Sequence, residues 1–158
     1  MPERKSAPAR VVGLALVLLC TGFARPESAR ATLSAEMQKQ LAESKYVYIQ
    51  SQRKDGSFSK AAEIWFFVHD GSVYVGSKKT TWRAKRIKAG HKAAKIHAFM
   101  PSGPSFDATG EIIADQAIWN LMFEAYAKKY ADGWSSYEKN FRGGAADGSY
   151  ALIRYTPK

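Results

Sequence analysis

The sequence predicts a mainly β domain of the α+β class, in which six antiparallel strands form a barrel flanked by helices. Aromatic and β-branched residues gather in six short runs separated by turn residues, and two or three further segments have helical spacing. A row of strands would leave two exposed edges, and closure into a full or partial barrel removes them. A two-layer sandwich is the alternative arrangement of the same strands.

The N-terminal half predicts one short helix followed by three strands. Ser34 can cap a helix that runs to residue 44. Aromatic or β-branched runs follow at residues 45–50, 61–68 and 73–77. The two intervening turns contain Asp55-Gly56 and Asp70-Gly71, and both dipeptides are typical of hairpins. We therefore expect an antiparallel meander over residues 45–77.

The C-terminal half predicts two more helices and three more strands. Residues 80–88 have lost the strand alternation and precede Gly90, as in a short helix with a glycine stop. Asp115 can cap a longer helix to about residue 130, which Gly133 would end. Residues 134–141 are aromatic but have no regular spacing. The remaining strands are expected at residues 94–100, 106–114 and 150–155.

The first 31 residues have the order of a secretory signal peptide. Three basic residues precede an apolar run from Val11 to Cys20, and a polar stretch ends at Ala29-Arg30-Ala31. The apolar run is too short for a spanning helix, which needs about 20 residues. We predict cleavage, a domain of residues 32–158, a periplasmic or secreted location and no stable membrane anchor.

The composition of residues 32–158 limits the chemistry that the chain can perform. The lone cysteine, Cys20, lies in the predicted signal peptide, and His69, His91 and His97 are not spaced as zinc ligands. Walker and dinucleotide-binding glycine patterns are absent as well. No catalytic residue or metal site is therefore predicted. Removing five basic and two acidic residues with the signal peptide lowers the net charge from +10 to +7, which favours anionic partners.

A basic run follows the third predicted strand. That strand ends at Gly76-Ser77, and the next helix carries Arg83, Lys85 and Arg86 in its first turns. Hydroxyl groups and guanidinium groups beside a helix start can hold a phosphate group. A solvated basic face is the alternative, because charge runs usually lie at the surface.

The order of these pieces resembles the pyridoxamine-5′-phosphate-oxidase-like family of flavin-binding split barrels. The succession consists of KYVYIQ, KDGS, AEIWF, DGSVYV and TWRAKRI, at residues 45–50, 54–57, 62–66, 70–75 and 81–87. With the return strands and the long helix, the similarity covers most of residues 41–157. The resemblance implies a six-stranded split β-barrel, a homodimer and a flavin mononucleotide (FMN) between its subunits.

The resemblance also implies positions for the cofactor. It places Ser77, Thr81 and Arg83 at the phosphate, with Lys85 or Arg86 nearby, and Arg83 stands where the family commonly has lysine. The isoalloxazine ring would run along Ile64, Trp65 and Phe66. Some relatives use the deazaflavin F420, some bind haem and some hold nothing.

Three functional hypotheses follow for the exported domain. The first is an FMN-dependent oxidoreductase of unknown substrate, the second a non-catalytic or haem-binding split barrel, and the third a basic module that binds polyanions without specificity for a nucleic acid. Five aromatic residues could wall a planar ligand or could belong to the core, namely Trp65, Phe66, Trp119, Trp134 and Tyr137.

Overall fold

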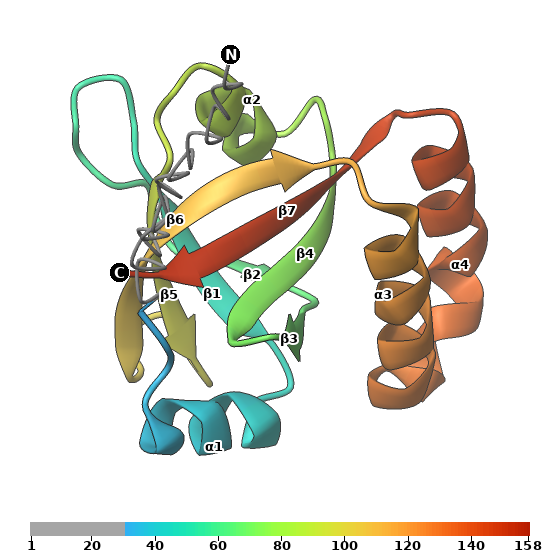
Figure 1. The fold of residues 1–158 in the computed structure, drawn as a ribbon, viewed down its shortest axis with the longest axis horizontal. Coiled ribbons are helices and arrows are strands. Elements are labelled where there is room, and N and C mark those ends of the chain that lie inside the picture. Colours follow the sequence, from blue (N-terminus) through green and yellow to red (C-terminus); the bar gives the residue numbers. More distant parts are fainter. Residues whose placement is uncertain (1–30) are drawn as a thin grey trace, which may run out of the picture.

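The computed structural model describes residues 31–158 (Figure 1). The predicted signal peptide, apart from its last residue, lies outside the described residues and remains a prediction. In the part of the chain that the structure describes, no helix combines the length and the apolar character needed to cross a membrane.

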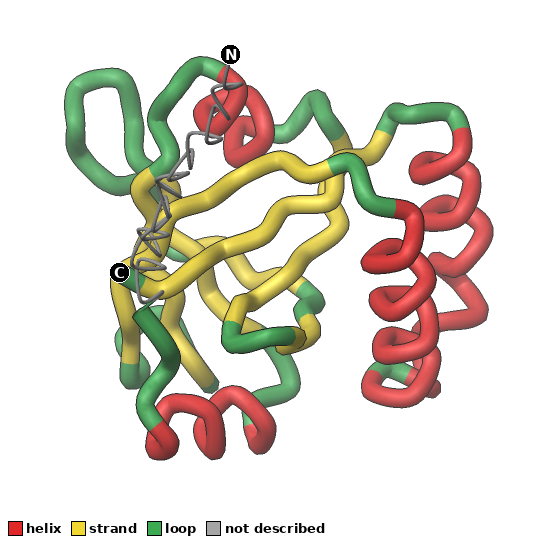
Figure 2. Tube along the Cα trace, viewed as in Figure 1, coloured by secondary structure: helices red, strands yellow, loops and turns green. Residues whose placement is uncertain are grey.

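Seven antiparallel strands form one strongly curled sheet (Figures 1 and 2). Their order across the sheet is β2-β1-β5-β6-β7-β4-β3. The strands are β1 (Val47–Ser51), β2 (Ala62–Ile64), β3 (Phe67–His69), β4 (Ser72–Lys78), β5 (Ala93–Ala98), β6 (Ser105–Ile113) and β7 (Tyr150–Pro157). The predicted barrel of antiparallel strands is confirmed, and the strand number is seven because one predicted strand is divided.

The divided strand is the predicted run over residues 61–68. Its first part, β2, pairs with β1, and its second part, β3, pairs with β4 at the opposite end of the sheet. Trp65 and Phe66 connect the two parts without pairing to a strand. The chain itself thus joins the two ends of the curled sheet. The hairpin turn before β4 is regular, since Asp70 and Gly71 have φ angles of 45° and 65°.

Two tyrosine side chains bind the backbone at this break. The Tyr126 hydroxyl donates to the carbonyl oxygen of Trp65 at 2.7 Å, and the Phe66 N–H donates to the Tyr130 hydroxyl at 2.9 Å. Buried backbone groups need such partners when a strand ladder does not supply them. The fold therefore stabilises the strand break with side-chain hydrogen bonds.

Two hydrophobic cores lie on the two faces of the sheet. The first fills the inside of the barrel and includes Val47, Ile96 and Ile153. The second is aromatic and lies between the sheet and the two C-terminal helices, which stand beside the barrel in Figure 1. Both faces of β4 are covered, so residues 72–77 are all buried. Trp119 and Trp134 belong to the second core, which settles their structural role.

The described residues form four helices. They are α1 (Ala35–Glu43), α2 (Trp82–Lys88), α3 (Gln116–Lys129) and α4 (Ala131–Ala146). The predicted caps are confirmed: the Ser34 hydroxyl accepts from the Met37 N–H, and the Asp115 carboxylate accepts from the Ala117 and Ile118 N–H groups.

The prediction for residues 133–141 was wrong. Gly133 does not end a helix but lies in the first turn of α4, and the break between α3 and α4 falls at Tyr130. Trp134 and Phe141 are seven residues apart, so both face the aromatic core. Three glycines in α4, at positions 133, 143 and 144, hide the helical pattern. Gly144 in particular leaves no room for a Cβ atom, because the Tyr150 ring packs against its backbone.

Substitution of Tyr126 tests the importance of the break. Tyr126→Phe leaves the partly buried Trp65 carbonyl without its donor, so we expect the free energy of unfolding to fall by about 1–3 kcal/mol. Urea denaturation measures the change. Tyr137→Phe is the matched control, because Tyr137 is 51% exposed and the change should stay within about 0.5 kcal/mol. Equal losses in both variants would contradict this account.

Candidate functional site

A basic cleft lies between β1, β2, the segment that joins them and the start of α2. Its volume is about 540 Å³. Four cationic side chains line it, from Arg53, Lys60, Arg83 and Arg86, against the single carboxylate of Glu63. Ser77 and Thr81 line it as well, as does Ile64 on β2. The cleft has the charge and size of a site for a phosphorylated small molecule.

Two hydroxyl groups lie at the junction of β4 and α2. The Ser77 and Thr81 side-chain oxygens are 3.0 Å apart. The Thr81 hydroxyl donates to the Lys78 carbonyl oxygen at 2.9 Å and accepts from the Ala84 N–H at 3.4 Å, so it caps α2. Because the proton of Thr81 goes to Lys78, Ser77 must be the donor between the two hydroxyls. Their geometry fixes the strand end against the helix start.

The Arg83 guanidinium has an unsatisfied buried nitrogen. Its Nε atom is inaccessible to solvent and has no hydrogen-bond partner among residues 31–158. The Tyr155 hydroxyl is also buried and unpaired. Burial raises the pKa of Tyr155, and the nearby positive charge of Arg83 partly offsets this rise. A buried donor without an acceptor costs about 1–3 kcal/mol, so an anionic oxygen beside Arg83 would be stabilising.

The remaining basic residues of α2 point in two directions. Arg86 lines the cleft, and its guanidinium lies 5.9 Å from the centre of the Trp82 ring. Trp82, also at the cleft, is 71% exposed. Lys85 instead lines a separate groove with four other charged residues, Lys79, Lys88, Lys92 and Glu111. The structure therefore brings Arg86 to the predicted phosphate position and leaves Lys85 outside it.

The three residues predicted along the flavin ring are separated by the break in the strand. Ile64 faces the cleft. Trp65 stacks on Tyr130 with 4.3 Å between ring centres, and it lines a small hollow with Tyr137 and Phe141. Phe66 is fully buried in the barrel core. The structure does not bring Trp65 or Phe66 to the basic cleft.

Sequence reasoning missed the cleft residues on the far side from α2. Arg53 and Lys60 flank the first hairpin turn and reach the cleft because β1 pairs with β2. Their basic character was visible in the sequence, but their distance from residues 77–86 along the chain concealed the contact. Ser51 and Ile49 on β1 line the same cleft.

His97 is a structural residue of the fold. His97 is buried, with its two ring nitrogens 3.0 Å from the Gln50 amide oxygen and 3.2 Å from the Gly103 carbonyl oxygen. Both contacts fit the structural role predicted for it. Within residues 31–158, no group of three histidine, cysteine, aspartate or glutamate side chains could hold a metal ion.

Comparison with known proteins identifies the architecture. The sequence matches no family model and no curated protein sequence. Among solved structures, a Clostridium acetobutylicum protein related to general stress protein 26, of the pyridoxinephosphate oxidase family, superposes with a TM-score of 0.54 at 16% identity, over 77% of this chain and 81% of that one. The chain has the fold of the pyridoxamine-5′-phosphate-oxidase-like split barrels.

Two further split barrels widen the comparison. HutZ, the haem storage protein of Vibrio cholerae, superposes with a TM-score of 0.58 at 12% identity, over 81% of this chain and 92% of that one. A conserved hypothetical protein of Mycobacterium tuberculosis gives 0.61 at 13% identity, over 85% and 86%. These superpositions establish the fold although the sequence identities are low. They confirm the predicted split barrel, and the alternative of a two-layer sandwich was wrong. They do not select a cofactor.

Thr81→Val tests the junction between β4 and α2. The variant loses the helix cap and the partner of Ser77, so the free energy of unfolding should fall by about 0.5–2 kcal/mol. Chemical denaturation measures it. The control is Thr80→Val at the preceding, exposed position, where we expect little change. If Thr80→Val destabilises the protein as much, the junction does not have the role described.

Proposed function

We propose that this protein is an exported split-barrel flavoprotein that binds FMN with its phosphate in the basic cleft and uses the flavin for a redox reaction. The observation that carries the proposal is the buried, unpartnered Nε of Arg83 in a cleft lined by three other cations. That nitrogen is a donor without an acceptor, and a phosphate oxygen is the acceptor that this environment favours.

The donors of the cleft suit a phosphate monoester. Arg83 and Arg86 come from α2, while Arg53 and Lys60 come from the opposite wall, so positive charge surrounds the space. A guanidinium group can donate to two phosphate oxygens at once. The Ser77 and Thr81 hydroxyls could rotate toward the ligand, at the expense of the hydrogen bonds they now make. The α2 helix has only seven residues and adds little by its dipole.

The position of the ring differs from the one that the resemblance implies. Apolar side chains of Ile49, Ala62 and Ile64 line the cleft on β1 and β2, and Trp82 lines it from α2. We infer that the isoalloxazine ring lies against these residues. Trp65 and Phe66 would then support the cleft from behind without touching the ring.

The chemistry in this proposal belongs to the cofactor. Bound FMN supplies hydride or electron transfer. The residues of the cleft bind the phosphate, orient the ring against β1 and β2 and keep water from one of its faces. No side chain has to act as a strong acid or base, which agrees with the lack of a conventional catalytic constellation among the described residues.

Flavin titration tests the phosphate site. Wild-type protein should bind FMN more tightly than riboflavin, which lacks the phosphate, as measured by quenching of flavin fluorescence. Arg83→Gln should weaken FMN binding by about 1.5–3 kcal/mol, the usual value of a hydrogen bond to a charged group, and should leave riboflavin binding nearly unchanged. This difference separates loss of the phosphate contact from general damage.

Lys88→Gln is the control for that experiment. It removes a cation from the same helix but from the groove outside the cleft, so FMN affinity should change little. Equal weakening by both substitutions would mean that net charge, and not the cleft, attracts FMN. No binding of either flavin to the wild-type protein would refute the proposal.

Haem is the second candidate, because one of the similar structures is a haem storage protein. His69 at the end of β3 is exposed and is the histidine most open to an axial ligand role. An absorption spectrum of the purified protein separates the candidates. Flavin bands support the first proposal, whereas a Soret band that His69→Ala abolishes would support haem.

We propose further that the chain functions as a homodimer in which the partner covers the open side of the cleft. Trp82 is 71% exposed beside the cleft, and tryptophan is among the residue types enriched at protein interfaces.

Sedimentation tests the dimer. The wild-type protein should sediment as a dimer, and Trp82→Glu should shift it toward monomer by placing a charge at the contact. Met100→Glu, at a position that is 53% exposed on the loop after β5, should leave the dimer intact. A wild-type monomer that still binds FMN would contradict the proposal that the subunits share the cofactor.

A further inference from the structure

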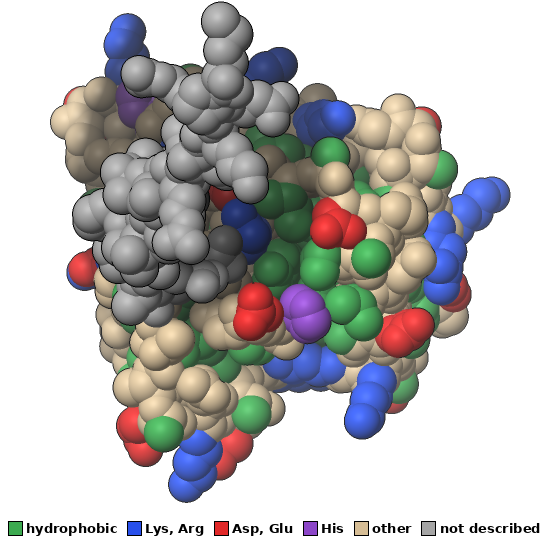
Figure 3. Space-filling model, viewed as in Figure 1, with side chains coloured by type: hydrophobic (Ala, Val, Ile, Leu, Met, Phe, Trp, Pro, Cys, Tyr) green, Lys and Arg blue, Asp and Glu red, His purple; other side chains and the backbone are tan. Residues whose placement is uncertain are grey.

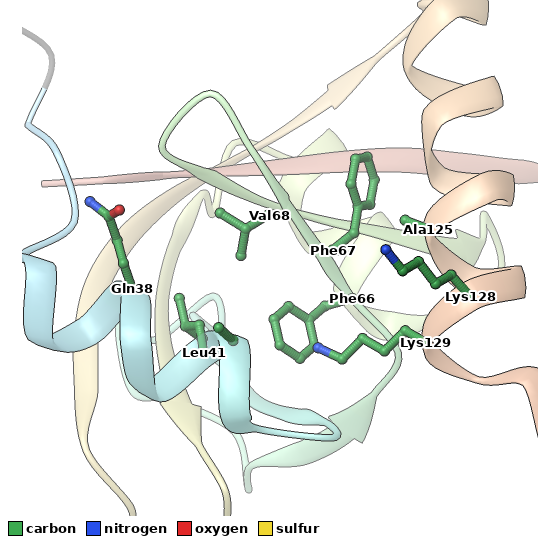
Figure 4. Close-up of a pocket in the computed structure, with 9 residues that line it drawn as sticks. Gln38, Leu41, Phe66, Phe67, Val68, Ala125, Lys128 and Lys129 are labelled. Carbon is green, nitrogen blue, oxygen red and sulfur yellow. The ribbon is translucent and has the colours of Figure 1, made fainter.

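A second cavity lies on the other side of the strand break, in a groove between α1, β3 and α3. Its volume is about 620 Å³, within the range of about 300–1,000 Å³ typical of small-molecule sites. Figure 4 shows Lys128 and Lys129 extending from α3 toward Phe66 and the side chains of α1. None of the residues that line this groove also lines the basic cleft.

The floor and walls of the groove are apolar. Leu41 of α1, Phe66 of the strand break and Phe67 of β3 form its buried floor, and Ala42 of α1, Val68 of β3 and Ala125 of α3 form its accessible apolar walls. Val68 is 40% exposed although it is a β-branched apolar residue. On the face drawn in Figure 3, hydrophobic and basic side chains meet between α1 and α3. An apolar surface open to water favours a ligand with an apolar part.

The two lysines are the charged residues that line the groove. The Lys129 ammonium lies 3.5 Å from the centre of the Phe66 ring and 5.9 Å from that of Tyr130. Within residues 31–158, neither Lys128 nor Lys129 forms an ion pair, and no aspartate or glutamate lines the groove. Gln38 is the other polar lining residue, and its amide nitrogen donates to the Leu33 carbonyl oxygen.

The surroundings of Lys129 disfavour its charged form. Burial lowers the pKa of this ammonium from 10.5 to about 8, since the apolar side chains around it replace water. The face of the Phe66 ring attracts the cation and replaces part of its hydration. A full anion at the same place would stabilise the charged form much more. The groove therefore combines an apolar surface with a cation that has no anionic partner.

We propose that this groove binds a single-chain anionic amphiphile, with its carboxylate or phosphate head against Lys128 and Lys129 and its apolar chain along Ala42, Val68 and Ala125. The site is separate from the proposed flavin cleft and does not depend on it. Phe66, which the family resemblance assigns to the flavin ring, forms part of this groove.

Calorimetric titration of the full domain with matched ten-carbon ligands tests the proposal. Decanoate and decyl phosphate carry the anionic head, decanol has none and decyltrimethylammonium has the opposite charge, and all are used below their micelle concentrations. We expect decanoate, decyl phosphate or both to bind, and the better of the two identifies the head group. Decanol should bind at least about tenfold more weakly, as expected for loss of a charged hydrogen bond.

Two variants locate the binding. Lys129→Gln should weaken decanoate binding by about 10- to 150-fold, and Lys139→Gln on α4, outside the groove, should not. Ala125→Leu fills the groove without changing its charge and should also block binding. Thermal unfolding confirms that each variant is folded. FMN affinity should remain at the wild-type value in all three, which keeps this test separate from that of the flavin.

A pH titration adds a signature that a merely structural lysine would not give. Only the charged ammonium attracts the head group, so decanoate affinity should fall as the pH rises through about 8. Lys128 is the other charged group that lines the groove. Its ammonium also loses positive charge as the pH rises, so it cannot reverse the expected fall in affinity. Failure of both anions to bind, equal binding of decanol, or unchanged affinity in Lys129→Gln would each overturn the proposal.

Discussion

Two hydrogen bonds join the side chains of Tyr126 and Tyr130 to the chain at Trp65 and Phe66, between the two candidate cavities. These bonds hold the point where β2 ends and β3 begins, and they connect the curled sheet to α3. Ile64 lies at the basic cleft, while Phe66 lies in the core beside the groove that Lys128 and Lys129 line. One break in a strand thus separates two cavities of different chemistry.

Local signals in the sequence predicted most of the fold. The caps at Ser34 and Asp115 and the turn at Asp70-Gly71 depend on neighbouring residues, and all three are confirmed. The strand break was not predictable in this way, because its hydrogen-bond partners lie more than 60 residues further along the chain. Residues 61–68 form one apolar and aromatic run that predicts a single strand, and the hydrogen bonds with Tyr126 and Tyr130 lie at the point where it divides. The helix α4 was hidden by glycines that pack closely against aromatic rings.

The candidate site was also predictable only where its residues are neighbours along the chain. Four residues lie close together in the sequence and also at the cleft, namely Ser77, Thr81, Arg83 and Arg86. Their order along the chain was therefore sufficient to predict that they lie together. Lys85 is a neighbour in sequence but lies on another side of a short helix. Arg53 and Lys60 join the cleft through the pairing of β1 and β2. A motif read along the chain cannot show such a contact.

We propose that the Arg83 guanidinium binds the phosphate of FMN. A crystal structure of the protein after incubation with FMN tests it most directly. We expect a phosphate oxygen within about 2.7–3.2 Å of a guanidinium nitrogen of Arg83, with the ring against Ile49 and Ile64 on β1 and β2. A phosphate bound elsewhere, or a cleft without flavin at a saturating concentration, would contradict it.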